Sequence, residues 1–153
     1  MSIAAIGRGK SSPEAVLVDD YLTRAGKAGR KLGLGPFDVQ EFEARKGGMQ
    51  AEAALLTKAV SGSGWLCTLD ERGQRLDSIA FANQFAQMRD AGRGNAAFII
   101  GGADGLDPDL RDRADVSISL GTMVWPHMLA RVMLAEQLYR ATQILSSTPY
   151  HRA

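Results

Sequence analysis

The last third of the chain decides the fold: residues 95–153 read NAAFIIGGADGLDPDLRDRADVSISLGTMVWPHMLARVMLAEQLYRATQILSSTPYHRA. An apolar run here ends in two glycines, and a second short apolar run, a long amphipathic segment and an aromatic, basic tail follow it. From Val116 onward the sequence holds one acid, Glu136, and three arginines. Pro149 should stop the long helix, so helix packing alone does not explain why the tail stays aromatic and cationic.

Short apolar runs alternate with amphipathic segments along the whole chain. This alternation predicts an α/β fold with a mostly parallel sheet flanked by helices. The predicted strands cover residues 2–6, 37–42, 65–69, 96–100 and 116–120, and the predicted helices cover residues 13–28, 50–60, 78–90, 108–114 and 126–146. The positions expected to face inward are Ala15, Val16, Tyr21 and Leu22 in the first helix, Ala54, Leu55 and Val60 in the second, and Ile79, Phe81, Ala82 and Phe85 in the third.

Length and composition limit the class of protein. A chain of 153 residues with 45% hydrophobic residues is expected to form a single domain over residues 1–153. Its net charge of +1 gives no global reason to bind nucleic acid, so an RNA-binding surface would depend on local charge. The lone cysteine, Cys67, makes no intrachain disulfide or cysteine-based metal site, and we expect it in the core. No segment approaches the ~20 apolar residues of a membrane helix, so we expect a soluble, cytoplasmic protein without a membrane partner.

The segment Gly7–Pro13 lies between the first predicted strand and helix, where a phosphate-binding loop would stand. Gly9-Lys10-Ser11 is not a Walker A motif, because the glycine that this motif needs five residues earlier is Ala4. Gly7-Arg8-Gly9 is likewise an incomplete dinucleotide fingerprint, because Ser12 stands at the third glycine position. We therefore interpret the segment as a basic surface loop suited to an RNA backbone.

Three loops follow the carboxyl ends of predicted strands, where ligands bind in parallel sheets. They cover residues 70–73, 101–105 and 121–126. Two glycines directly after a buried strand allow either a tight turn or the close approach of a ligand. Asp104 in the same loop could cap a turn as readily as bind a ligand. Both alternatives stay open from the sequence.

The long C-terminal helix opens with Pro126 and His127, and its first amides should point over the sheet. One of its sides carries Leu129, Val132, Met133 and Tyr139, which could be a core face or a dimer seam. Glu136 lies on the same largely apolar side, where it either pairs with an arginine or has a functional role. The tail, Tyr150-His151-Arg152, combines a ring, an imidazole and a guanidinium, which suit stacking on a base and holding a phosphate or oxyanion.

Five short motifs occur together, in order and suitably spaced. They are TLDERG (68–73), IGGADGL (100–106), PHMLARV (126–132), EQLYRA (136–141) and PYHR (149–152). Together they resemble the RlmH family, small bacterial SPOUT methyltransferases that modify a pseudouridine of large-subunit ribosomal RNA. The resemblance extends over the whole chain.

The resemblance implies a SPOUT α/β knot, in which the C-terminal part threads a loop as a trefoil knot, and a homodimer whose second subunit helps to build the RNA site. It implies S-adenosylmethionine as cofactor, no metal, and 23S rRNA in the large subunit or the whole ribosome as partner rather than DNA. Carried over position by position, the cofactor would contact Leu69, Gly101, Gly102, Leu120, Gly121, Thr122, Met123, Val124, Trp125 and Pro126.

The methyl acceptor implied by the resemblance is N3 of a pseudouridine in the assembled ribosome. N3–H is an imide, so its proton must leave, and an arginine near the flanking carbonyls would stabilise the resulting charge. Arg152 is our candidate for this role, with Tyr150 and His151 positioning the base. His127 and Glu136 are candidates for supporting proton transfer, and the sequence does not choose between them.

The knot loop departs from the family pattern at three positions. The family more often has serine at Gly121, threonine at Val124 and a smaller aliphatic residue at Trp125. Cofactor contacts made by the backbone should survive these changes. A non-catalytic, ribosome-associated RNA-binding protein that retains the fold is the alternative, and the intact glycine pair and tail favour the enzyme. A different nucleotide-binding α/β enzyme is disfavoured by the incomplete glycine motifs.

Overall fold

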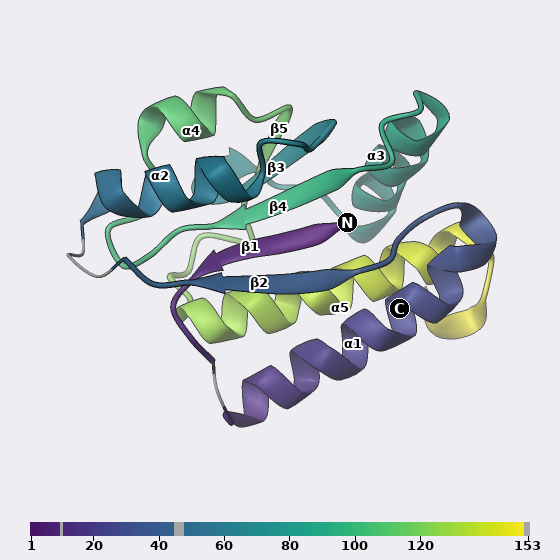
Figure 1. Ribbon diagram of the computed structural model, residues 1–153. Helices are drawn as coiled ribbons and strands as arrows, with labels where there is room; N and C mark the ends of the chain where they lie inside the picture. The colour runs from purple at the N-terminus through teal and green to yellow at the C-terminus, as the bar shows by residue number, and fades with distance from the viewer. Residues whose placement is uncertain (10, 45–47, 152–153) are drawn as a thin grey trace.

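The computed structural model describes residues 1–9, 11–44 and 48–151 (Figure 1). Five strands pair in parallel in the order β2-β1-β4-β3-β5. The strands are β1 (Ser2–Ile6), β2 (Asp38–Phe42), β3 (Trp65–Gln74), β4 (Ala96–Ile100) and β5 (Val116–Ile118). The helices are α1 (Pro13–Gly29), α2 (Met49–Ala59), α3 (Ser78–Asp90), α4 (Pro108–Asp112) and α5 (His127–Leu145), with 3₁₀ turns η1 (Arg30–Leu32) and η2 (Pro149–His151). The predicted α/β fold with a parallel sheet is confirmed.

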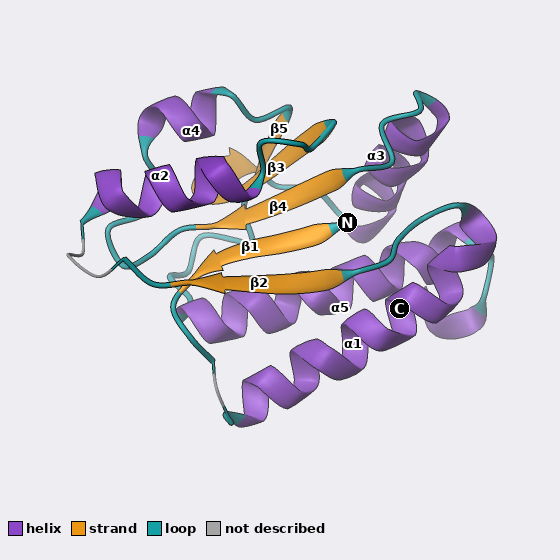
Figure 2. Cartoon of the chain, viewed as in Figure 1, coloured by secondary structure: helices purple, strands orange, loops and turns teal. Residues whose placement is uncertain are grey.

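Helices cover both faces of the sheet (Figure 2). Helices α1, α3 and α5 form one core with the sheet, and α2 and α4 form a smaller core on the opposite face. All five residues of β4 are buried, as expected for a central strand with helices on both sides. Phe98 of β4 packs against Phe85 of α3 and Trp65 of β3, with ring centroids 5.7 Å and 5.8 Å apart.

Three positions expected to face inward are exposed. Val16 in α1 is 68% exposed and Ile79 in α3 is 61% exposed, and Ala54 in α2 is exposed as well. In α1 the buried face runs through Val18 and Leu22 instead. These predictions were wrong because apolar residues lie on more than one side of each helix, and periodicity alone does not say which side meets the sheet.

Strand β3 is longer than the sequence predicted. It continues through the expected turn at 70–73, and after a register shift Gln74 pairs with Ile118 of β5. Gly73 makes this possible, because a Cβ there would lie 2.5 Å from the Ile118 carbonyl carbon. Strand β5 ends at Ile118 rather than Leu120, because the Ser119 hydroxyl donates to the Gly121 carbonyl at 2.9 Å and so closes a local turn.

Within residues 1–9, 11–44 and 48–151, no helix is both long enough and apolar enough to cross a membrane.

Candidate cofactor-binding site

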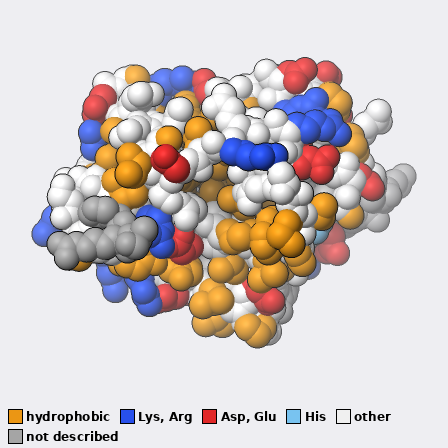
Figure 3. Space-filling view, turned by 180° about the vertical axis from the view of Figure 1, so that it is seen from behind, with side chains coloured by type: hydrophobic (Ala, Val, Ile, Leu, Met, Phe, Trp, Pro, Cys, Tyr) orange, Lys and Arg blue, Asp and Glu red, His pale blue; other side chains and the backbone are white. Residues whose placement is uncertain are grey.

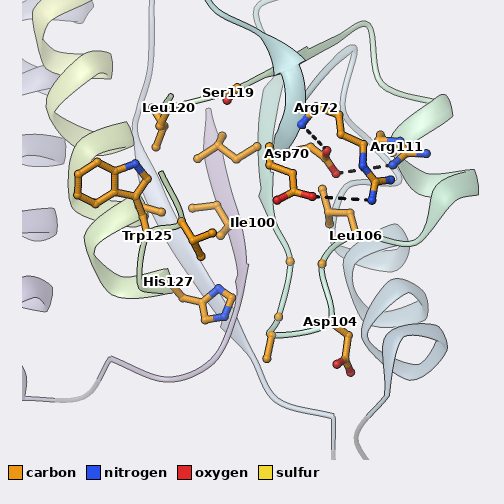
Figure 4. A pocket seen from close by; sticks show the side chains of 18 of the residues that line it. Asp70, Arg72, Ile100, Asp104, Leu106, Arg111, Ser119, Leu120, Trp125 and His127 are labelled. Atoms are coloured by element: carbon orange, nitrogen blue, oxygen red, sulfur yellow. Dashed lines mark hydrogen bonds and ion pairs between the residues drawn. The ribbon is translucent and has the colours of Figure 1, made fainter. Parts of the chain in front are cut away.

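A cavity of about 420 Å³ lies at the carboxyl ends of β3, β4 and β5 (Figure 4). The three loops that the sequence places at this edge all contribute to it. The predicted cofactor residues that line the cavity are Leu69, Gly101, Gly102, Leu120, Gly121, Met123, Val124 and Trp125. Thr122 and Pro126 are not among its lining residues, although their neighbours on both sides in the chain are. A volume of this size is typical of small-molecule sites.

The glycine pair after β4 is required by the packing of its own loop. A Cβ on Gly101 would lie 2.7 Å from the Gly105 carbonyl oxygen, and a Cβ on Gly102 would overlap with the carboxylate of Glu52 in α2. Gly105 has a φ of +81° and its N–H donates to the Gly102 carbonyl at 3.0 Å. The tight-turn alternative is therefore confirmed, and the close approach of a ligand to this loop, which lines the cavity, stays a prediction.

The cavity has one charged wall and one apolar wall. In Figure 4, Asp70, Arg72 and Arg111 lie together on one side of the site, across from Leu120 and Trp125. The Asp70 side chain is only 10% exposed, forms an ion pair with Arg111 at 3.8 Å, and accepts a hydrogen bond from the Arg72 N–H at 2.9 Å. The sequence analysis placed Asp70 in a loop at this end of the sheet but named neither Asp70 nor Arg111 as a cofactor contact. The position of Asp70 directly after the buried part of β3 was the signal that could have found it.

Two further candidates from the sequence also line the cavity. Asp104 is exposed and lies at its edge, whereas Asp107 caps α4 by accepting from the Asp109 N–H at 3.0 Å. His127 is exposed at the first turn of α5 and its imidazole points toward the cavity in Figure 4. His127 is therefore the predicted proton-transfer residue that the fold brings to the cofactor loops.

Arg131, one turn after His127, is buried, which sequence reasoning did not foresee. Its guanidinium donates to the Ile6 and Gly7 carbonyls, both at 3.2 Å, and pairs with Glu41 of β2. Burial lowers the pKa of Arg131, and the neighbouring Glu41 carboxylate opposes that shift. An arginine on an otherwise apolar helix face was the available signal.

Glu136 lies in a cluster farther along α5. Its Oε1 accepts from Arg140 Nε at 2.9 Å and from the Tyr150 hydroxyl at 3.1 Å, and its Oε2 accepts from Gln137 Nε2 at 2.7 Å. The interpretation that Glu136 pairs with an arginine is confirmed. The Tyr150 ring packs on Tyr139 with centroids 4.7 Å apart. Burial, together with the Glu136 carboxylate, raises the pKa of Tyr150 to about 12.

The structure does not bring this cluster to the cofactor cavity of the same chain. Glu136 follows His127 by nine residues, which at 1.5 Å per residue is about 13 Å along the helix. Helix α5 starts at the edge of the sheet that holds the cavity and ends at the opposite edge (Figure 1). Tyr150 follows at that far end and folds back only as far as Glu136. His151 lies in η2, and Arg152 lies outside the described residues.

A second cavity, of about 680 Å³, lies between α1, α3 and α5. Val132, Met133 and Glu136 line it together with Leu120 and Gly121 of the cofactor loop. Leu129 is exposed on the same side of α5, whereas the core of this chain is built on Leu134 and Leu138. The apolar side of α5 named in the sequence analysis is therefore a core face only in part, because Val132 packs against the core while Leu129 is exposed.

Among the described residues, no group of three or more His, Cys, Asp or Glu side chains is arranged to hold a metal ion. A parallel α/β sheet with a glycine-loop cavity over its strand ends defines the class of α/β proteins that bind a small ligand at the carboxyl ends of their strands.

The sequence matches the family model described as "Predicted SPOUT methyltransferase" over residues 1–151. A protein of Ruegeria pomeroyi named ribosomal RNA large subunit methyltransferase H is 61% identical over 153 residues, covering 99% of this chain and 98% of that protein. The protein of the same name from Paracoccus denitrificans is 60% identical over the same shares. A solved structure of a probable methyltransferase from Bordetella pertussis has a TM-score of 0.54 at 12% identity, covering 92% of this chain and 95% of that one. The chain belongs to the SPOUT methyltransferase family, and its fold agrees with that likeness.

SPOUT methyltransferases use S-adenosylmethionine, and the cavity fits this cofactor. The backbone of the glycine loop and the apolar side chains of Leu120 and Trp125 form one side, which suits an adenine ring. The opposite wall carries the carboxylates of Asp70, Glu71 and Asp104 together with the guanidinium groups of Arg72 and Arg111. Charges of both signs suit a molecule that carries a sulfonium, an ammonium and a carboxylate group. The residues predicted from the sequence as cofactor contacts therefore form a site of suitable chemistry.

Proposed function

We propose that this protein methylates ribosomal RNA of the large subunit. The observation that carries this proposal is the cofactor cavity in a chain that matches proteins named for that reaction along its whole length. The bound cofactor supplies an activated methyl group. The intact glycine loop favours the enzyme over a non-catalytic RNA-binding protein, since that loop is the backbone of the cavity. The finer proposal, from the resemblance, is that 23S rRNA is methylated at N3 of a pseudouridine in the assembled ribosome.

We propose further that each active site combines the cofactor cavity of one chain with the tail of a second. The support is the position of Tyr150, which contacts Glu136 far along α5 rather than the cavity at the start of that helix. A tail held there cannot serve the cofactor of its own chain without leaving its hydrogen bond and its contact with Tyr139. In a homodimer that brings a partner's tail over the cavity, Tyr150 keeps these contacts and a tail still reaches the cofactor.

Exposed apolar side chains supply a surface for such a homodimer. Val124 is 88% exposed and Met123 69%, and Leu129, Val16 and Leu17 are exposed as well. Figure 3 shows a group of hydrophobic side chains on one face of the molecule. Large exposed apolar patches usually mark interaction sites, and the second cavity beside α5 adjoins the cofactor loop. The trefoil knot implied by the resemblance stays a prediction.

The roles of the site residues follow from this arrangement. In this proposal His127, which is exposed at the cavity, takes the imide proton of the acceptor base. Both carboxylate oxygens of Glu136 already accept hydrogen bonds, so its role in the proposal is to position Tyr150 of the tail. Tyr150 and His151 would hold the base, and Arg152 would stabilise the charge that develops on the acceptor carbonyls.

The first test is transfer of a labelled methyl group from S-adenosylmethionine. The acceptors are ribosomes from cells that lack this protein and, in parallel, protein-free 23S rRNA. Label on intact ribosomes and none on bare RNA supports the proposed function and substrate state. Binding of the cofactor without label on either acceptor contradicts the proposed function.

A mixing experiment tests the composite site. One variant, Gly101→Val, blocks the cofactor cavity, and the other, Arg152→Ala, disables the tail. Each variant alone should be inactive, while co-expressed, differently tagged chains purified as mixed dimers should regain activity at one of their two sites. Mixed dimers that stay inactive, although both chains are folded, contradict a site shared between chains.

A further inference from the structure

Helix α5 and the segment that leaves β1 are joined by a buried polar contact that the proposed mechanism does not use. The Arg131 guanidinium donates to the carbonyls of Ile6 and Gly7, the last residue of β1 and the residue after it. The same guanidinium pairs with Glu41 of β2. Arg131 is 1% exposed and the Glu41 side chain is 27% exposed, so the guanidinium is shielded from solvent while the carboxylate is partly open to it.

The same carboxylate oxygen also holds the segment that follows β1. Glu41 Oε1 accepts from the Gly9 N–H at 2.9 Å as well as from Arg131 Nη1. The Met128 side chain occupies the space where a Cβ of Gly9 would stand. Two residues of the first turns of α5, Met128 and Arg131, therefore fix the path of Gly7–Gly9.

The first turns of α5 are also joined directly to the cofactor loop. Residues 119–126 run directly into α5 at His127, and Ala130, beside Arg131, lines the cofactor cavity. Any shift of the first turns of α5 moves both the loop that precedes them and the His127 side chain. Because a buried guanidinium is costly to leave unpaired, the contact with Glu41 and the two carbonyls holds these turns in place.

We propose that Arg131 and Glu41 are positioning residues that fix the cofactor loop at 119–126 and the Gly7–Gly9 segment in one relation to each other. Neither side chain contacts the cofactor in this proposal; each acts through the backbone that it holds. The coupling rests on the cofactor cavity and not on the identity of the RNA. Where Gly7–Gly9 lies against RNA, the coupling would link substrate docking to cofactor binding, and that consequence rests on the proposed function.

Lysine cannot replace arginine in this contact. The guanidinium reaches Glu41 with Nη1 and the two carbonyls with Nη2, whereas the donors of an ammonium radiate from a single nitrogen. Arg131→Lys therefore keeps the charge and loses the geometry. Glu41→Gln keeps an oxygen acceptor for Gly9 and loses the charge. A suitable control is Asp20→Asn, which removes an exposed ion pair with Arg24 within α1, on a different part of the chain.

The test measures cofactor affinity by calorimetry and hydrogen exchange by mass spectrometry, at a temperature well below the melting point of every variant. We expect Arg131→Lys to weaken S-adenosylmethionine binding about tenfold, as a misplaced binding element does, and to speed exchange in the peptides that carry Gly7–Gly9 and 119–126. Glu41→Gln should act in the same direction with a smaller effect. The control should change neither quantity.

The coupling is wrong if Arg131→Lys lowers the melting temperature but leaves cofactor affinity within twofold of the parent and exchange in both segments unchanged. It is equally wrong if exchange rises in only one of the two segments. Should Arg131→Lys fail to fold, Glu41→Gln and Gly9→Ala, whose added methyl displaces Met128, carry the same two measurements. The experiment uses no RNA, so its result can be interpreted even if the proposed rRNA reaction is not observed.

Discussion

The Tyr150 hydroxyl donates a hydrogen bond to Glu136 Oε1 at 3.1 Å, across 14 positions of the chain. The contact brings the segment after α5 back along that helix as far as Glu136. Arg140 stacks on the Tyr150 ring, with its guanidinium carbon 5.0 Å from the ring centroid, and pairs with the same Glu136 at 2.7 Å. The start of the tail is thus held by two contacts, with Glu136 and with Arg140, and neither residue lines the cofactor cavity.

Tyr150→Phe should lower the rate of RNA methylation and leave cofactor affinity unchanged. The variant keeps the ring packing on Tyr139 and loses only the hydrogen bond that orients the tail. We expect a loss of about tenfold in kcat/KM for the ribosome, equivalent to ~1.4 kcal/mol. Single-turnover transfer and cofactor titration measure the two quantities separately. A parallel loss of cofactor binding would show that the tail supports the cavity of its own chain.

The ionisation of Tyr150 should be displaced to high pH. Its pKa rises from an ordinary 10.0 to about 12, first through burial and then through Glu136. Since the folded-state pKa is the higher one, the contribution of the neutral phenol to stability is complete below pH 10 and is lost as the pH rises toward 12. Absorbance titration of tyrosinate, compared between the parent and Tyr150→Phe, isolates this midpoint.

Glu136→Gln should move that midpoint downward while burial keeps it above the ordinary value, because it removes a negative charge from beside the phenol. An unchanged midpoint in this variant would mean that the Tyr150–Glu136 contact does not persist in solution.

Gly73→Ala should destabilise the fold. A Cβ at Gly73 would lie 2.5–2.8 Å from backbone atoms of Ile118, where the long end of β3 crosses β5. Forcing atoms into such a contact typically costs about 1–3 kcal/mol, which urea unfolding resolves. Gly62→Ala is the matched control, because nothing lies within 4 Å of the position of its added Cβ. Equal stability of the two variants would contradict the close approach of β3 and β5.

Gly101→Ala should weaken cofactor binding more than it lowers stability. Its Cβ would meet the Gly105 carbonyl at 2.7 Å, so the loop must open, and this loop is a wall of the cavity. We expect at least a roughly tenfold rise in the dissociation constant of S-adenosylmethionine. Gly26→Ala in α1, with open space around its Cβ, should bind the cofactor as the parent does. If Gly101→Ala binds the cofactor as tightly as the parent does, this loop is not part of the cofactor site.

The order of the strands and helices could be predicted from the sequence because it depends on local signals. Apolar runs of strand length, such as residues 96–100, are followed by glycines, and Ser12 and Asp77 cap their helices by accepting hydrogen bonds from the Ala15 and Ala80 N–H groups. The position of three loops at one end of the sheet followed from the same reasoning, because parallel strands bring their carboxyl ends together, whereas their assignment to the cofactor came from the family resemblance.

The sequence by itself determined a parallel α/β protein with glycine loops at its strand ends, because these features follow from neighbouring residues. Only the tertiary structure decided which side of α1 is buried, that β3 extends past Gly73, and that Arg131 is buried against Glu41 from another strand. It also decided that Glu136 binds Tyr150 far from His127, although all three residues belong to one short stretch. Such contacts depend on how each helix is rotated against the sheet and on how far apart residues lie along a helix axis. The spacing of residues within one segment of the chain does not determine which segments pack together.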